Sequence, residues 1–170
     1  MQGVGAISVA PSSQASPTLG QQPAVTGGVA QVSVTHGASD WNLGLSPKVP
    51  MRLSIKQAAG DMDLNLVGLP INSLTTVQGV GALSIKAPAR SFKASITQNS
   101  GGLDIYLPAN TGLQITVTNL TGDVNFGSKS MASGIGVTGT YKTSNFASAK
   151  NKITMDVKMA MGSIDVHLPR

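Results

Sequence analysis

Polar residues recur along the chain at intervals of 20 or 21 residues, and they carry the oxygen atoms that hard cations prefer. These residues are Asn42, Asp63, Ser84, Asp104, Asn125, Asn145 and Asp165. If they stack above one another, a column of oxygens could bind Ca²⁺, with Asp63, Asp104 and Asp165 as the candidate ligands. The alternative is a solvated outer face, which we favour because neutral residues mostly separate the acidic ones. We therefore predict neither a metal site nor a cofactor.

The other residues that could support catalysis do not form a recognisable set. His36 and His167 lie near opposite ends of the repeat region, so a triad or a two-histidine metal site is not expected. The segment Gly134–Gly139 matches the GxGxxG pattern, but nucleotide binding also requires a helix after it, and a strand pattern occupies this region instead. All seven acidic residues are Asp, and most of them lie in or beside the periodic positions. We predict that the protein is not an enzyme.

Apolar residues surround the periodic positions in a pattern that is typical of half-buried strands. The predicted core columns are Trp41, Leu43, Leu64, Ile85, Ile105, Phe126, Phe146 and Val166. A second apolar-polar-apolar strand lies eight to ten residues upstream of each periodic position, as at Leu53 and Ile55. Each repeat is thus expected to contain two strands that are too short to form a core alone.

Glycine and proline mark the two turns of each repeat. Glycine stands three residues before the periodic position in five repeats, as at Gly60 and Gly81, where a positive φ or a close backbone approach is expected. Proline follows the second strand at Pro47, Pro70, Pro88, Pro108 and Pro169, outside the hydrogen-bonded ladder. The sixth repeat, around Ser144, fits the pattern least well.

The predicted fold is therefore an all-β, single-domain β-solenoid of about seven rungs with a repeat of 20 to 21 residues. Residues 29–170 form the solenoid domain. Residues 1–28 form a short strand followed by a flexible linker rich in Pro, Gly, Ser and Gln. No segment has helical spacing over three turns.

The periodic segments resemble a known group of proteins. The stretches LNLVGLPINSLTTVQGVGALSIKAP, GGLDIYLPANTGLQITVTNLTGDV and NKITMDVKMAMGSIDVHLP are similar to the toast-rack, adhesin-like β-solenoid domains of bacterial envelope proteins. That group includes C-terminal domains of cell-wall-active antibiotic response regulators. The likeness covers about residues 30–170, and it implies an envelope location with a binding or sensing role and no catalysis.

The N-terminal segment repeats a sequence found later in the chain. GVGAISVAP, from Gly3 to Pro11, closely matches GVGALSIKAP, from Gly79 to Pro88, yet it lies out of register with the repeat. Such a spare strand could cap its own end rung or pair with a neighbouring subunit by β-augmentation, and a disordered tail is the third possibility. The predicted strand-donor or self-association residues are Gly3, Val4, Ala6, Ile7 and Val9.

Composition narrows the functional classes. Charged residues make up 11% of the chain and aromatic residues 4%, and the net charge is +5. Nucleic-acid binding is not expected, because it would need a basic stripe interleaved with aromatics. The sequence shows neither a membrane-spanning run nor a signal peptide, and it contains no cysteine.

These observations favour a structural or interaction module of the cell envelope or the extracellular surface. We expect it to self-associate as a homo-oligomer, or to bind an envelope protein or polymer, through its sheet faces and end strands. The alternative is a ligand- or Ca²⁺-sensing regulatory domain in an envelope-stress pathway.

Overall fold

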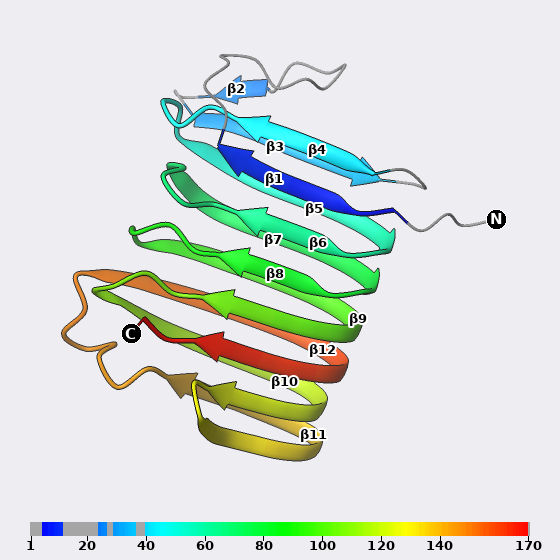
Figure 1. Ribbon diagram of the computed structural model, residues 1–170, viewed down its shortest axis with the longest axis vertical. Helices are drawn as coiled ribbons and strands as arrows, with labels where there is room; N and C mark the ends of the chain where they lie inside the picture. The colour runs from blue at the N-terminus through cyan, green and yellow to red at the C-terminus, as the bar shows by residue number, and fades with distance from the viewer. Residues whose placement is uncertain (1–4, 12–23, 27–28, 37–39, 170) are drawn as a thin grey trace.

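The computed structural model describes residues 5–11, 24–26, 29–36 and 40–169. In this part of the chain every regular element is a β-strand, and the strands lie in a tall stack (Figure 1). The strands are β1 (Ile7–Pro11), β2 (Ala24–Thr26), β3 (Val29–His36), β4 (Trp41–Leu45), β5 (Met51–Ala59), β6 (Met62–Asn65), β7 (Ile71–Val80), β8 (Leu83–Lys86), β9 (Phe92–Tyr106), β10 (Thr111–Phe126), β11 (Lys129–Lys142) and β12 (Asn151–His167). The all-β prediction is confirmed for the described residues.

The stack has two layers, which we call layer A and layer B. Layer A holds β2, β3, β5, β7 and the first halves of β9, β10 and β12. Layer B holds β1, β4, β6, β8 and the second halves of β9, β10 and β12. The three long strands bend from one layer into the other, and β11 runs beside both halves of β10. Apolar side chains of the two layers alternate with outward polar ones and meet in one core.

Glycine makes the bend between the layers possible. Gly60, Gly81 and Gly101 have φ values of 117°, 142° and 140°, which L-residues rarely adopt. A Cβ on Gly81 would lie 2.0 Å from the carbonyl oxygen of Gly60, and one on Gly101 would lie 1.9 Å from that of Gly81. The prediction of positive φ and close approach at these positions is confirmed.

The order of the repeats in the stack differs from their order in the sequence. Repeats two, three and four lie side by side, because β5 pairs with β7 and β7 with β9. Repeat seven, β12, then lies between β9 of repeat four and β10 of repeat five, parallel to both. The expected stacking in consecutive order is therefore wrong beyond repeat four. Since every repeat presents similar apolar columns, the spacing alone does not specify which repeats are neighbours.

Repeat six also departs from the arrangement of the other repeats. Its strand β11 runs antiparallel to β10, so the sheet is mixed. Only Gly127 and Ser128 connect the two strands, and Gly127 has a φ of 60°. A two-residue connection returns the chain directly along its neighbour, whereas a parallel rung would need a longer crossover.

The N-terminal strand is part of the same stack. β1 lies between β4 and β6 of layer B and pairs in parallel with both (Figure 1). It therefore neither caps an end rung nor extends from the molecule. Most of the predicted linker, residues 12–23 and 27–28, lies outside the described residues.

Candidate functional site

The outer face of layer A is basic. Its exposed cations are Arg52, Lys56, Lys93, Lys142, Lys152 and Lys158. The single carboxylate among its described side chains is Asp156. The cations of β5, β9 and β12 alternate with buried residues along their strands, so the strand pattern directs them outward. Lys142 is placed on the same face by its pairing with Gln114. The remaining outward positions are mainly Ser, Thr, Asn and Gln.

Five of the six cations form two columns across the strands. Arg52 and Lys93 are both paired with Ser73, and the same column continues through Thr154 and Gln114 to Lys142. In the second column, Lys56 is paired with Val77, and the column continues through Thr97 to Lys158. With a strand spacing of about 4.8 Å, cations in a column lie roughly 10 to 15 Å apart.

Layer B carries the opposite charge. Its acidic side chains are Asp40, Asp61, Asp63, Asp104, Asp123 and Asp165, and the described cations on this layer are Lys86 and Lys129. The two faces share one core but have opposite electrostatic character, which composition and net charge did not reveal. The signal was present in the sequence: Lys56, Lys93, Lys152 and Lys158 fall in the first strand of a repeat, and most aspartates fall in or beside the second strand.

Two of the candidate metal ligands are neighbours. Asp104 and Asp165 are direct cross-strand partners, because repeat seven lies beside repeat four. The expectation that neutral residues would separate them is wrong for this pair. Asp63 is not adjacent to either of them, because Ser84 on β8 lies between Asp63 and Asp104. Among the described residues, no group of three or more His, Asp, Glu or Cys side chains is arranged to hold a metal ion.

Each of the two paired carboxylates has its own hydrogen-bond partner. His167 Nε2 lies 2.7 Å from Asp104 Oδ1, and Asn125 Nδ2 donates to Asp165 Oδ1 over 2.9 Å. The His167 ring also stacks on Tyr106, with centroids 4.2 Å apart and planes 8° from parallel. These contacts offset the repulsion between the adjacent carboxylates.

The other histidine lies far from this cluster. His36 ends β3 in layer A, and β5, β7 and β9 separate that strand from β12. Its side chain lies outside the described residues. The GxGxxG segment lies within β11, and no helix follows it in the described part of the chain.

The predicted core columns are mostly buried. Leu43, Leu64, Ile85, Ile105, Phe126 and Val166 are each at most 5% exposed. Leu64 pairs with Ile85 and Ile85 with Ile105, as the column model required. The side chain of Trp41 lies outside the described residues.

Phe146 is placed differently from the other column residues. It lies in a turn, half-buried, rather than in a strand. The ammonium groups of Lys142 and Lys152 lie 5.6 and 5.9 Å from its ring centroid, within the range of cation–π attraction.

The predicted strand-donor residues fall inside the sheet. Ile7 and Val9 are 1% and 0% exposed, and Ala6 is exposed at the start of the strand. Gly3 and Val4 lie outside the described residues. Val9 joins the core column between Leu43 and Leu64.

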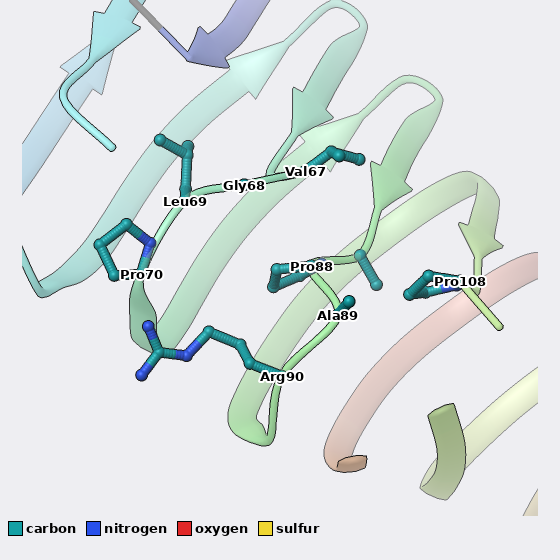
Figure 2. Close-up of a pocket in the computed structure, with 9 residues that line it drawn as sticks. Val67, Gly68, Leu69, Pro70, Pro88, Ala89, Arg90 and Pro108 are labelled. Atoms are coloured by element: carbon teal, nitrogen blue, oxygen red, sulfur yellow. The ribbon is translucent and has the colours of Figure 1, made fainter. Parts of the chain in front are cut away.

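A shallow hollow of about 240 Å³ lies among the proline-containing turns (Figure 2). It is lined by Val67, Gly68, Leu69, Pro70, Ala87, Pro88, Ala89, Arg90 and Pro108. Arg90 extends along the turn toward Pro70, and it is the one charged residue in this lining. The lining contains no acidic side chain.

Two family models match the chain. The N-terminal domain of toast_rack, DUF2154, matches residues 21–106. The chain belongs to the toast-rack family. The model described as cell wall-active antibiotics response LiaF, C-terminal, matches residues 87–166 of this toast-rack chain. The predicted resemblance is thus confirmed.

A solved structure has the same fold. It is a protein from Clostridium sporogenes that is provisionally named a cell adhesion protein. The TM-score is 0.62 at 16% identity, and the match covers 99% of this chain and 94% of the other. No curated protein matches the sequence. Within the described residues, no helix is long and apolar enough to span a membrane.

Proposed function

We propose that this chain is a non-catalytic module of the cell envelope that binds an anionic polymer on the outer face of layer A. The observation that carries the proposal is the separation of charge between the two faces. The described side chains of layer A present Arg52, Lys56, Lys93, Lys142, Lys152 and Lys158 against the single carboxylate of Asp156. A face of one sign concentrates ligands of the opposite sign.

The arrangement of the cations favours a linear partner. The column through Arg52, Lys93 and Lys142 follows the direction of strand stacking, and the column through Lys56 and Lys158 runs beside it. Neighbouring charges in a column are separated by roughly one to two Debye lengths at physiological salt, so they repel one another only weakly. A phosphate-bearing chain that lies along a column can therefore meet successive cations, while the Ser and Thr hydroxyls between them offer hydrogen bonds.

The comparisons are compatible with this role. One matching family is named for the response to cell wall-active antibiotics, and the similar structure is named for cell adhesion. A module that binds an envelope polymer would serve either role, as an attachment point or as a reader of the state of the wall.

The decisive experiment compares two triple charge reversals. One changes Lys56→Glu, Lys93→Glu and Lys158→Glu on the layer A face. The control changes Lys48→Glu, Arg90→Glu and Lys150→Glu, which lie in turns. Both triples alter the net charge equally.

Binding of inorganic polyphosphate is measured by calorimetry for both variants. Each reversed cation near an anionic surface costs about 1 kcal/mol, so the face variant should bind roughly 100-fold more weakly. The turn variant should lose far less. Equal losses of affinity in the two variants would show that net charge alone governs binding. If the protein binds anionic lipid vesicles more tightly than polyphosphate, the partner of this face is a membrane and not a polymer.

A second mode of interaction is favoured by the end strand β11. Its residues are mostly exposed, and Ile135 is 90% exposed, whereas most apolar strand residues are buried. An exposed edge strand with an apolar side chain is a template for pairing with another chain. We expect Ile135→Lys to lower the average mass in light scattering at high protein concentration. Unchanged mass would remove β11 as an association surface.

A further inference from the structure

A strand-sized gap separates repeat one from repeat two in layer B. In layer A the corresponding strands β3 and β5 pair directly. In layer B, β4 and β6 each pair with β1, which lies between them (Figure 1). The gap is therefore a binding slot for one extended strand, and the N-terminal segment of the chain fills it.

The strand in the slot, β1, is held by the same kinds of contact that hold β8 in the third repeat. Asp40 Oδ1 accepts a hydrogen bond from the Ala6 amide over 3.0 Å, and Asp61 Oδ1 accepts one from the Ala82 amide over 2.9 Å. Asp40 precedes β4 and Asp61 precedes β6, and each alanine directly follows a glycine, Gly5 or Gly81. The likeness between the segments around Ala6 and Ala82 thus has a structural cause.

Glutamine side chains also make equivalent contacts at β1 and in the next repeat. Gln78 Nε2 donates to the Gly60 carbonyl over 2.5 Å, and the Gln57 side chain makes the equivalent contact with the Gly5 carbonyl. A Cβ on Gly60 would collide with the Gly5 oxygen, just as one on Gly81 would collide with that of Gly60. The slot is therefore shaped for a Gly-Ala-apolar-Ser-apolar strand.

The slot requires an occupant. Without β1, the facing edges of β4 and β6 would lack partners inside the sheet, which is costly for buried backbone groups. The core column would also lose Ile7 and Val9, which are almost fully buried.

We propose that this slot also accepts β1 from a second copy of the chain, so that copies are joined by strand exchange. Only residues 12–23 connect β1 to β2. A chain of twelve residues can span at most about 40 Å when fully extended, enough to lead β1 to an adjacent molecule. Exchange replaces every contact of β1 with an identical contact, so the slot itself does not distinguish its own strand from that of a neighbour.

The absence of cysteine from the sequence allows a direct test. Ser8 and Asn42 are cross-strand partners on the outer side of β1 and β4. Partners on adjacent strands are separated by a Cα distance that a disulfide can bridge. One preparation carries Ser8→Cys, and a second, enlarged by a fused tag, carries Asn42→Cys. The two are mixed at high concentration, oxidised and separated by mass without reductant.

Strand exchange predicts a covalent heterodimer of the tagged and untagged chains that diminishes when a synthetic peptide of residues 3–11 is added. The matched control mixes Asp63→Cys with Ser84→Cys, which are partners on β6 and β8 and cannot exchange by way of the linker. It should give several-fold less heterodimer. The double variant Ser8→Cys with Asn42→Cys on one chain should form the bond and thereby show that the geometry is correct.

One combination of results would overturn the inference. In it, the disulfide forms in the double variant, but the mixed single variants give no more heterodimer than the control. This must hold even after the single variants are unfolded and refolded together. This outcome is independent of polymer binding, since neither Ser8 nor Asn42 belongs to the basic face.

Discussion

The outer faces of layers A and B are built from the same repeat on the same core, yet they differ in charge. Lysine and arginine prevail on layer A, and aspartate prevails on layer B. Because inward residues alternate with outward ones, the core constrains only every second position of a strand. The outward positions are free to differ between layers, so their composition reports on interactions with other molecules rather than on folding.

The largest expected effect comes from breaking the bend that holds the two faces back to back. Gly81→Ala places a Cβ 2.0 Å from the Gly60 oxygen at a φ of 142°. Strain and overpacking together should lower the free energy of unfolding by about 3 kcal/mol or more. Chemical denaturation measures this loss.

Gly68→Ala is the matched control for that change. Its φ is 76°, but a Cβ there would meet nothing within 4 Å. We expect a loss of about 1 kcal/mol from the backbone conformation alone. Similar losses at both positions would mean that the close approach at the bend is unimportant.

A smaller effect is expected inside layer A. The Thr76 hydroxyl is buried without a hydrogen-bond partner, between Ile55 and Ile96 on the adjacent strands. Thr76→Val removes this polar group at nearly constant volume and should stabilise the fold by about 1 kcal/mol. Thermal unfolding of Thr75→Val, which changes the exposed neighbour, provides the comparison. Destabilisation by Thr76→Val would indicate that the hydroxyl has a partner, such as a buried water.

Layer B offers a test of its paired carboxylates. Asn125→Ala removes the amide that donates to Asp165 and should cost about 1 kcal/mol. Adding Asp165→Asn should recover part of this loss, because it also removes the repulsion from Asp104. If the second change lowers the melting temperature further, the adjacent charges do not oppose each other.

The smallest effect is expected at His167. Its side chain and that of Asp104 are 44% and 40% exposed, so their interaction is weakened by solvent. His167→Ala should therefore cost only about 0.5 kcal/mol. A loss larger than that of Asn125→Ala in the same denaturation assay would contradict this ranking.

Several features of the fold could be predicted because they depend only on local spacing. Alternation placed Leu64, Ile85 and Ile105 in one column, and glycine marked the bend at Gly60 and Gly81. The order of the strands could not be predicted. β12 lies between β9 and β10, but its apolar pattern is the same as that of the other repeats, so the pattern does not identify it as their neighbour. Which strand fills a gap depends on the connections and on the whole assembly.

The reversal of repeat six left a signal that can be recognised in retrospect. The proline that follows the second strand in other repeats is missing after Phe126, and Gly127 and Ser128 form a hairpin connection instead. The charged faces could have been predicted from the alternation, since Lys56, Lys93 and Lys158 all fall at outward positions. The pairing of Asp104 with Asp165 could not, because it follows from the strand order.

Amide NMR during a titration with inorganic polyphosphate tests the central claim most directly. The proposed binding face predicts salt-dependent shifts at Lys56, Lys93, Lys158 and their neighbours on β5, β9 and β12 within layer A. The amides of Asp63 and Ser84 in layer B should remain unchanged. Shifts that concentrate on layer B, or that are spread evenly over the turns and both layers, would contradict the account.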